Sequence, residues 1–182
     1  YFIVNGTEKV ILVQEQLSKN RVIVETDAKK SMVSASVTSS THERKSKSYV
    51  VMKKERIYLQ HNVLTEAVPI VIALKAMGVQ SDHEMLLLVA GTDATYQDDF
   101  AVNFEEAAKL GIFSQQQALE WIGGRVKMGK SRFGQPQRRN FAQDGLEALA
   151  NIVITHVPVI GLDFRPKALY VCFMVRRVLM AM

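Results

Sequence analysis

The sequence contains little of what identifies secreted or membrane proteins. It has one cysteine, Cys172, and four prolines among 182 residues. A single cysteine cannot form an internal disulfide, and because Cys172 lies in the apolar run 169–175 we expect a small buried hydrophobe in a reducing compartment. The longest apolar runs, such as 85–90 and 152–154, fall far short of the roughly 20 residues that a membrane span needs. No signal peptide is visible, and no membrane partner is expected.

Catalytic and metal-binding patterns are also missing from the sequence. The four histidines occur singly, with no second ligand at metal spacing, at His42, His61, His83 and His156. The paired carboxylates at 98–99 and 105–106 are adjacent in sequence, so on a helix they point apart. The serine-rich stretch 34–48 has no obvious base to activate a hydroxyl. We therefore predict no catalytic residue, metal site or cofactor within this chain.

Positive charge is plentiful and concentrated. Lysine and arginine number 23 against 18 acidic residues, a formal net charge of +5. Between Trp121 and Asn140 no acidic residue interrupts the basic side chains Arg125, Lys127, Lys130, Arg132, Arg138 and Arg139. A more diluted basic stretch runs through residues 44–56. Clustered charge of one sign predicts contact with a polyanion or an acidic partner, although a solvated basic loop over 123–137 is the simpler interpretation.

One motif in the basic segment imitates a nucleotide site. Residues 124–131 read GRVKMGKS and satisfy the G-x-x-x-x-G-K-[ST] pattern of phosphate-binding loops. That chemistry requires a strand before the loop and a helix after it, so that backbone amides converge on the phosphates. Here a helical segment, 114–122, precedes the motif, and Gly134 and Pro136 oppose a helix after it. A P-loop nucleotide hydrolase is therefore the weakest hypothesis.

The first third of the chain has the pattern of an antiparallel sheet. Asn5-Gly6 separates two apolar runs and favours a tight hairpin turn. Further short β-like runs occupy 22–24, 32–41, 49–52 and 57–59, separated by polar segments. We expect these strands to form an antiparallel sheet with one solvated face.

From Val68 onward the pattern is helical. Pro69 suits a first helical position and Gly78 a helix end. Capping-box spacing marks helix starts at Ser81 and Ser114, and a looser version marks Asn103, with Gly111 as a stop. Later helices are expected over 141–154 and 167–182. The predicted fold class is α+β: a β-rich N-terminal part, then a helical half, in a single compact domain.

Several segments together resemble a known family. YFIVNGTEKVILVQEQ at the start is similar to the second-largest subunit of multisubunit RNA polymerases, and LSKNRVIVE and VTSSTHE resemble the RNA polymerase III version most. VPIVIALKAMGVQSD, SQQQALEWIGGRV, ITHVP and MVRRVL continue the resemblance in the family's order. An RNA polymerase II-type assignment remains possible. The resemblance implies a piece of a larger subunit, with residues 1–16 as an edge of the protrusion, 17–168 as the lobe domain, and 169–182 as a helix returning to the protrusion.

The resemblance also implies a role and partners. The lobe would be a non-catalytic wall of the DNA-binding cleft in a nuclear enzyme, with the magnesium and zinc sites elsewhere in the polymerase. Its partners would be DNA in the cleft and other polymerase subunits, including the largest subunit and a heterodimer related to the initiation factor TFIIF. The hairpin motif would bring Lys9 and Gln14 near nucleic acid, although Lys9 beside Glu8 also fits a solvated strand edge. A free-standing basic nucleic-acid-binding module is the alternative from another class.

Overall fold

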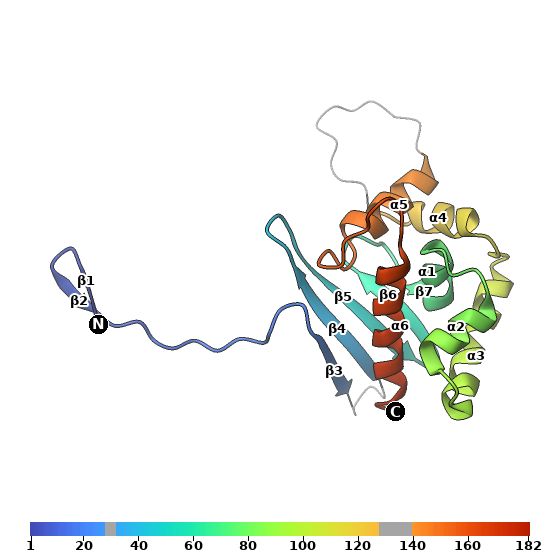
Figure 1. Cartoon of the computed structure of the whole chain (residues 1–182), viewed down its shortest axis with the longest axis horizontal. Coiled ribbons are helices and arrows are strands. Elements are labelled where there is room, and N and C mark those ends of the chain that lie inside the picture. Colours follow the sequence, from blue (N-terminus) through green and yellow to red (C-terminus); the bar gives the residue numbers. More distant parts are fainter. Residues whose placement is uncertain (28–31, 128–139) are drawn as a thin grey trace.

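The computed structural model describes residues 1–27, 32–127 and 140–182. Within these ranges a five-stranded sheet and six helices form the body, and residues 1–18 form an arm that extends away from it (Figure 1). The predicted α+β class, with an antiparallel N-terminal part and a helical remainder, is confirmed. The arm carries the hairpin predicted at Asn5-Gly6, with strands β1 (Phe2–Val4) and β2 (Thr7–Lys9). Asn5 and Gly6 have φ values of 50° and 76°, the left-handed conformation that such a turn requires.

The sheet of the body is antiparallel throughout, in the order β3-β4-β5-β6-β7. Its strands are β3 (Val22–Asp27), β4 (Met32–Ser40), β5 (Lys45–Lys53), β6 (Arg56–His61) and β7 (Val68–Pro69). Successive side chains alternate between two faces. A row of fully buried side chains crosses four strands on what we call the core face: Ala35, Val50, Leu59 and Val68. The opposite, open face carries Lys45, Lys47, Tyr49, Lys53, Arg56 and Tyr58.

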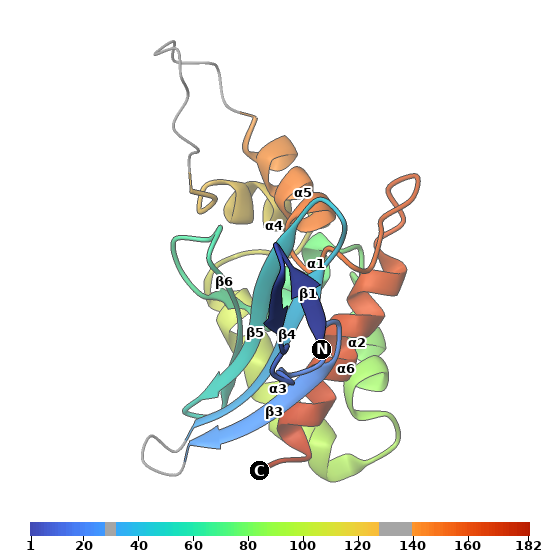
Figure 2. The same ribbon diagram turned by 90° about the vertical axis from the view of Figure 1, so that its left-hand side faces the viewer.

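The helices build the hydrophobic core against the core face. They are α1 (Ile70–Ala76), α2 (Asp82–Ala90), α3 (Ala94–Lys109), α4 (Gln115–Gly123), α5 (Phe141–Asn151) and α6 (Arg165–Leu179). Every residue of α1 is buried, and this short helix contacts α3, α4, β6 and β7. α6 crosses β3, β4 and β5, and buries Val171, Cys172, Met174 and Val175 (Figures 1 and 2). Cys172 is a buried free cysteine, as predicted, and burial raises the pKa of its thiol to about 12.

The sheet has two different edges. At one edge β7 is only two residues long, so the amide of Ile57 lies beyond its reach. The side chain of Asn103 on α3 fills this gap: its Oδ1 accepts a hydrogen bond of 2.7 Å from the Ile57 amide. A buried amide without a partner is costly, which explains a 2% exposed asparagine in the middle of a helix. At the other edge lies β3, which pairs only with β4 among the described residues.

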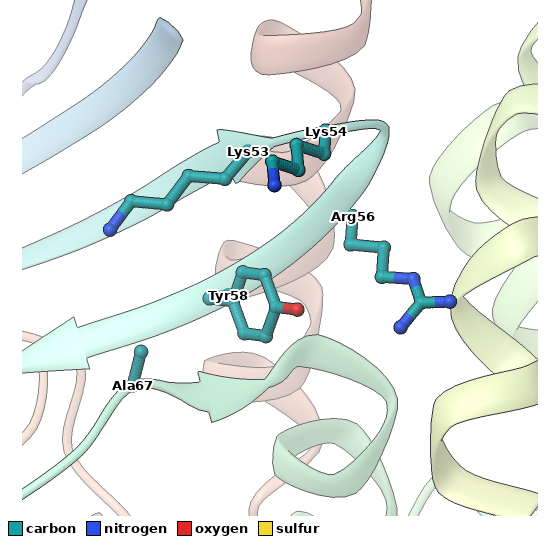
Figure 3. Close-up of a pocket in the computed structure, with 5 residues that line it drawn as sticks. All are labelled: Lys53, Lys54, Arg56, Tyr58 and Ala67. Carbon is teal, nitrogen blue, oxygen red and sulfur yellow. The ribbon is translucent and has the colours of Figure 1, made fainter.

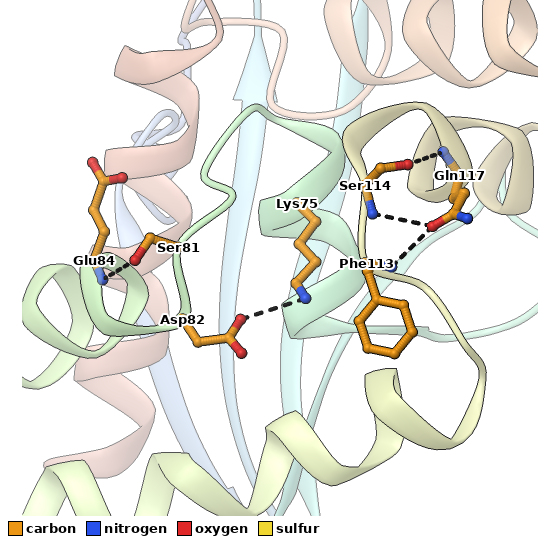
Figure 4. A network of polar contacts seen from close by, with 7 residues as sticks. All are labelled: Lys75, Ser81, Asp82, Glu84, Phe113, Ser114 and Gln117. Carbon is orange, nitrogen blue, oxygen red and sulfur yellow. Dashed lines mark hydrogen bonds and ion pairs between the residues drawn. The ribbon is translucent and has the colours of Figure 1, made fainter.

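Helix starts largely follow the sequence signals. Ser114 and Gln117 form the full capping box predicted for α4, and Ser81 Oγ accepts from the Glu84 amide at 3.4 Å (Figure 4). Next to these caps the buried Lys75 lies 3.4 Å from the Asp82 carboxylate and 5.7 Å from the Phe113 ring centroid. The capped starts of α2 and α4 thus flank a cation that α1 carries into the core.

Two predicted helix starts were wrong. Asn103 does not begin a helix: α3 begins nine residues earlier, where Asp93 accepts from the Thr95 amide at 3.1 Å. The tertiary contact with Ile57 explains why asparagine occurs there. Pro69 lies one residue outside α1, at its N-cap, because it completes β7 before the helix begins. The stops at Gly78 and Gly111 are confirmed, with φ values of 92° and 68°.

α4 and α5 cross in close contact because each has a glycine at the crossing. A β-carbon added to Gly123 would lie 1.7 Å from the Phe141 carbonyl oxygen, and one added to Gly145 would lie 2.4 Å from that of Leu119. Only glycine allows backbones to approach so closely. The crossing fixes the end of α4, from which the chain leads directly into Arg125 and Lys127.

Candidate nucleic-acid interface

The arm carries the first two predicted contact residues, Lys9 and Gln14. Both are exposed, and Figure 1 shows the hairpin apart from the sheet and helices. The structure therefore does not bring Lys9 and Gln14 together with the other predicted residues. The arm also exposes large apolar side chains, among them Val10 at 78% and Val13 at 99%. Contiguous exposed apolar side chains of this kind are typical of an interaction surface.

Arg125 lies at the body but its charge is already engaged. Its guanidinium carbon lies 3.6 Å from the Trp121 ring centroid, and its Nε lies 3.3 Å from a carboxylate oxygen of Glu66. Nη1 also donates to the Trp121 carbonyl at 3.2 Å, and the Arg125 carbonyl accepts from the Thr65 amide at 2.8 Å. Arg125 therefore holds the segment after α4 against residues 65–66, and Glu66 partly offsets its charge.

Lys127 lies in a basic pocket that the sequence alone does not reveal. Its Nζ donates to the Asn62 carbonyl at 2.8 Å, and its amide donates to the Val63 carbonyl at 2.8 Å. The pocket has a volume of about 380 Å³. Its lining contains no acidic residue and comprises Arg44, Lys45, Ser46, His61, Asn62, Val63, Lys127 and Ile152. We call this the cation pocket: it unites Lys127 with the start of β5, 82 residues earlier in the sequence at Lys45.

His61 forms an uncharged part of the cation pocket. It is 7% exposed, and its Nδ1 accepts a hydrogen bond of 3.1 Å from the Val63 amide. Burial, together with the nearby charges of Arg44 and Lys127, lowers the pKa of His61 to about 4. The ring is therefore neutral at pH 7 and its proton lies on Nε2, for which the described residues offer no acceptor. The pocket thus gathers three cations and no carboxylate, which suits an anion such as a phosphate.

A second basic hollow lies on the open face of the sheet, at the β5–β6 turn. It has a volume of about 530 Å³ and is lined by Lys53, Lys54, Arg56, Tyr58 and Ala67. Figure 3 shows these residues on the side of the strands away from α6, with the Tyr58 ring among the basic side chains. The Tyr58 hydroxyl donates to Glu106 on α3 at 3.3 Å. Burial and the Glu106 carboxylate raise the pKa of Tyr58, so it remains a neutral phenol at pH 7.

The remaining predicted contact residues are Lys130, Arg132, Arg138 and Arg139, and all four lie outside the described residues. The same holds for residues 128–131 of the P-loop-like motif. Its first residue, Gly124, is the C-cap of helix α4, and Val126 then forms an isolated bridge with Leu64. A helix, not a strand, thus precedes the motif, as the sequence predicted, and this is the wrong neighbour for a phosphate-binding loop.

The sequence did not predict one serine–histidine contact that resembles part of a catalytic site. Ser39 Oγ lies 2.7 Å from His156 Nδ1 and 3.0 Å from Thr155 Oγ1, although 117 residues separate Ser39 from His156. Ser39 is fully buried, and its Oγ also accepts from the His156 amide at 2.8 Å. A hydroxyl without exposure cannot meet a substrate. The contact instead ties β4 to the segment after α5, and no local pattern in the sequence could have signalled it.

The described part of the chain holds no group of three or more histidine, cysteine, aspartate or glutamate side chains placed to bind a metal ion. None of the described helices is long and apolar enough to cross a membrane.

Comparisons with known proteins place most of the chain in one family model. Residues 18–182 match the model described as RNA polymerase Rpb2, domain 2. The chain is 61% identical over 182 residues to DNA-directed RNA polymerase III subunit RPC2 of Saccharomyces cerevisiae and 59% identical to that of Schizosaccharomyces pombe. It is 41% identical over 181 residues to the subunit RPC2 of Drosophila melanogaster. Each alignment covers 100% of this chain, which spans only 15–16% of the length of these relatives.

Proposed function

The chain belongs to the RNA polymerase Rpb2, domain 2 family, as the lobe of a second-largest subunit of the RNA polymerase III type, and from this premise we propose that it forms a non-catalytic wall of the DNA-binding cleft. The cation pocket is the observation that carries the proposal. Arg44, Lys45 and Lys127 converge there without a carboxylate in the lining. Phosphate backbones attract such a surface whatever their base sequence, which suits a wall along which DNA moves.

The domain is also proposed to have no catalytic role. Magnesium and zinc sites of the polymerase would lie in other segments, and this domain would contribute shape and positive potential. The burial of Ser39 supports this assignment, because the Ser39–His156 contact serves packing. The intact assembly would act as a nucleotidyltransferase in the nucleus, transcribing small RNA genes.

The domain boundaries and partners are proposed on similar grounds. Residues 1–16 would join the neighbouring protrusion, which would cover the exposed apolar side chains of the arm. Residues 17–168 would form the lobe. Residues 169–182, of which 169–179 belong to α6 on the sheet, would lead back toward the protrusion. Other polymerase subunits, including the largest one and a TFIIF-like heterodimer, would contact the remaining surfaces.

A salt titration tests the role of the cation pocket. In the full-length subunit, assembled into polymerase, Arg44, Lys45 and Lys127 would be replaced by alanine, and binding to duplex DNA measured from low to high potassium chloride. Loss of up to three phosphate contacts should reduce the slope of log K against log salt by about 2–3, equally for different sequences. The matched control is Lys109→Ala, which removes an exposed lysine paired with Glu105 on α3.

The salt titration also separates the proposed wall from the alternatives. An unchanged slope would contradict the proposed wall. A free-standing nucleic-acid-binding module would instead require tight, salt-dependent DNA binding by residues 1–182 alone. A nucleotide hydrolase would require saturable ATP or GTP binding that Lys130→Ala abolishes, and the helix before the P-loop-like motif already disfavours it.

A further inference from the structure

The unpaired edge of β3 faces a groove along α6, and we propose that this groove binds an extended segment of a partner polypeptide as an additional strand of the sheet. The segment would carry an acidic residue and apolar side chains at alternate positions. This inference deepens the docking role proposed above and rests on it for the setting of the partner in the polymerase. It does not involve the cation pocket.

The backbone of β3 is available for pairing. β3 pairs with β4 on one side, and no described strand lies on its other side. Figures 1 and 2 both show β3 as the outermost strand of the sheet, and α6 lies across the sheet face and reaches β3 as well as β4 and β5. An unpaired edge is a template for another strand, and natural proteins usually protect it with lysine, proline or a bulge. The sequence of β3, VIVETD, contains neither lysine nor proline. Its two carboxylates, Glu25 and Asp27, alternate with Val22 and Val24 and therefore lie on the open face of the sheet, away from the groove.

The groove beside this edge has walls of two kinds. On α6 the side chains Tyr170, Phe173 and Arg177 recur at spacings of three and four and therefore share one helix face. On the strand, Val22 and Val24 face them, and together with Asn20 and Arg21 they enclose about 440 Å³. Phe173 remains 44% exposed although it lies in this hollow. Such an apolar floor next to a strand edge is the arrangement by which strand-addition domains hold alternate side chains of a peptide.

Charge defines the occupant further. Arg21 and Arg177 both line the groove, and neither pairs with a carboxylate of the described residues. The Arg177 guanidinium lies over the Phe173 ring, 5.1 Å from its centroid, which holds it at the groove. An acidic side chain on the added strand would therefore find a partner at the rim. Backbone pairing along β3 requires peptide groups, so a polypeptide fits this surface and a nucleic acid does not.

The test uses assembled polymerase that contains the full-length subunit. A photoreactive amino acid replaces Phe173 in one preparation and Arg176 in the other, and cross-linked residues are identified by mass spectrometry. Arg176 is the matched control, because it is an exposed neighbour on α6 that does not line the groove. In parallel, hydrogen exchange of residues 22–27 is compared between the native assembly and the Arg21→Glu/Arg177→Glu variant.

The expected result is a cross-link from position 173 to one segment of another subunit, with the acidic and alternating apolar pattern, at a yield about tenfold above position 176. Charge reversal should accelerate exchange of the β3 amides by about tenfold, because the added strand leaves. If the double variant fails to assemble, Arg177→Gln replaces it with a smaller acceleration in the same direction.

Other occupants would overturn the inference. A cross-link from position 173 to nucleic acid, to the arm of the same subunit or to a second copy of this chain would contradict the proposed partner strand. Equal cross-link yields at positions 173 and 176, or unchanged hydrogen exchange of the β3 amides, would also overturn it. The proposed cleft wall would fail differently, through the salt slope of DNA binding, which the groove variants should leave unaltered.

Discussion

The crossing of α4 and α5 makes a sharp prediction, because alanine should destabilise two helices that it normally favours. Gly123 lies at the last position of α4 and Gly145 in the interior of α5. The new β-carbon at position 123 would lie 1.7 Å from the Phe141 carbonyl oxygen, whereas real β-carbons keep at least 3.0 Å from such atoms. The obstacle is backbone, so the helices themselves must separate by more than about 1 Å.

The magnitude follows from two opposing terms. Alanine gains about 0.5–1 kcal/mol over glycine inside a helix, while forcing atoms into a packed contact costs about 1–3 kcal/mol. For Gly145→Ala, where the β-carbon lies 2.4 Å from the Leu119 oxygen, we expect a net loss of about 1–2 kcal/mol. Gly123→Ala has the shorter contact and should lose about 2–2.5 kcal/mol, at the upper end of the net range.

Urea denaturation of residues 1–182, followed by far-ultraviolet circular dichroism, measures these free energies of unfolding. Gly124→Ala provides the matched control: Gly124 has φ −62°, and its new β-carbon would lie 3.6 Å from the nearest atom, the Glu120 carbonyl oxygen. This control should be neutral or stabilising by up to about 0.5 kcal/mol. Equal effects at positions 123 and 124 would refute the close crossing as the reason for the glycines.

Three further outcomes are expected from buried polar groups. Asn103→Leu leaves the Ile57 amide without its acceptor and should cost about 1–3 kcal/mol in urea denaturation, with exposed Asn62→Leu as a control of the same chemistry. Lys167→Met removes the Nζ that donates to the carbonyls of Leu149, Ala150 and Val153 at 2.7–2.8 Å, and thermal unfolding should detect a loss of about 1–3 kcal/mol. The pKa of His61 is about 4 in the fold and 6.5 unfolded, so its contribution is complete above pH 6.5 and should fall by about 2–3 kcal/mol toward pH 4. His61→Gln should flatten that part of the stability–pH curve, and an unchanged curve would contradict a buried neutral imidazole.

Two separate surfaces of the body carry the two binding roles proposed for the domain. The cation pocket lies where the start of β5 meets the segment after α4, and the groove for a partner strand lies at the β3 edge beside α6. Their linings share no residue. Substitutions at one surface should therefore leave binding at the other surface unchanged, provided that the common hydrophobic core stays intact.

Local signals in the sequence determined most elements of this protein. Short β-like runs between polar segments predicted the strands, Asn5-Gly6 predicted the hairpin, and the Ser114–Gln117 pair predicted the start of α4. These features depend on neighbours within a few residues, so the printed sequence contains their cause. The family resemblance also came from the sequence, and the match of residues 18–182 to the family model confirmed it.

The tertiary structure decided which residues meet. Asn103 looks like a helix cap in sequence, but it serves the edge of β6 across 46 residues. Arg125 and Lys127 look equivalent in one basic run, yet Arg125 is held by Trp121 and Glu66 while Lys127 joins Arg44 in the cation pocket. Such differences arise from long-range packing, in which the partner is set by how sheet and helices share one core. No local pattern of residues records that choice.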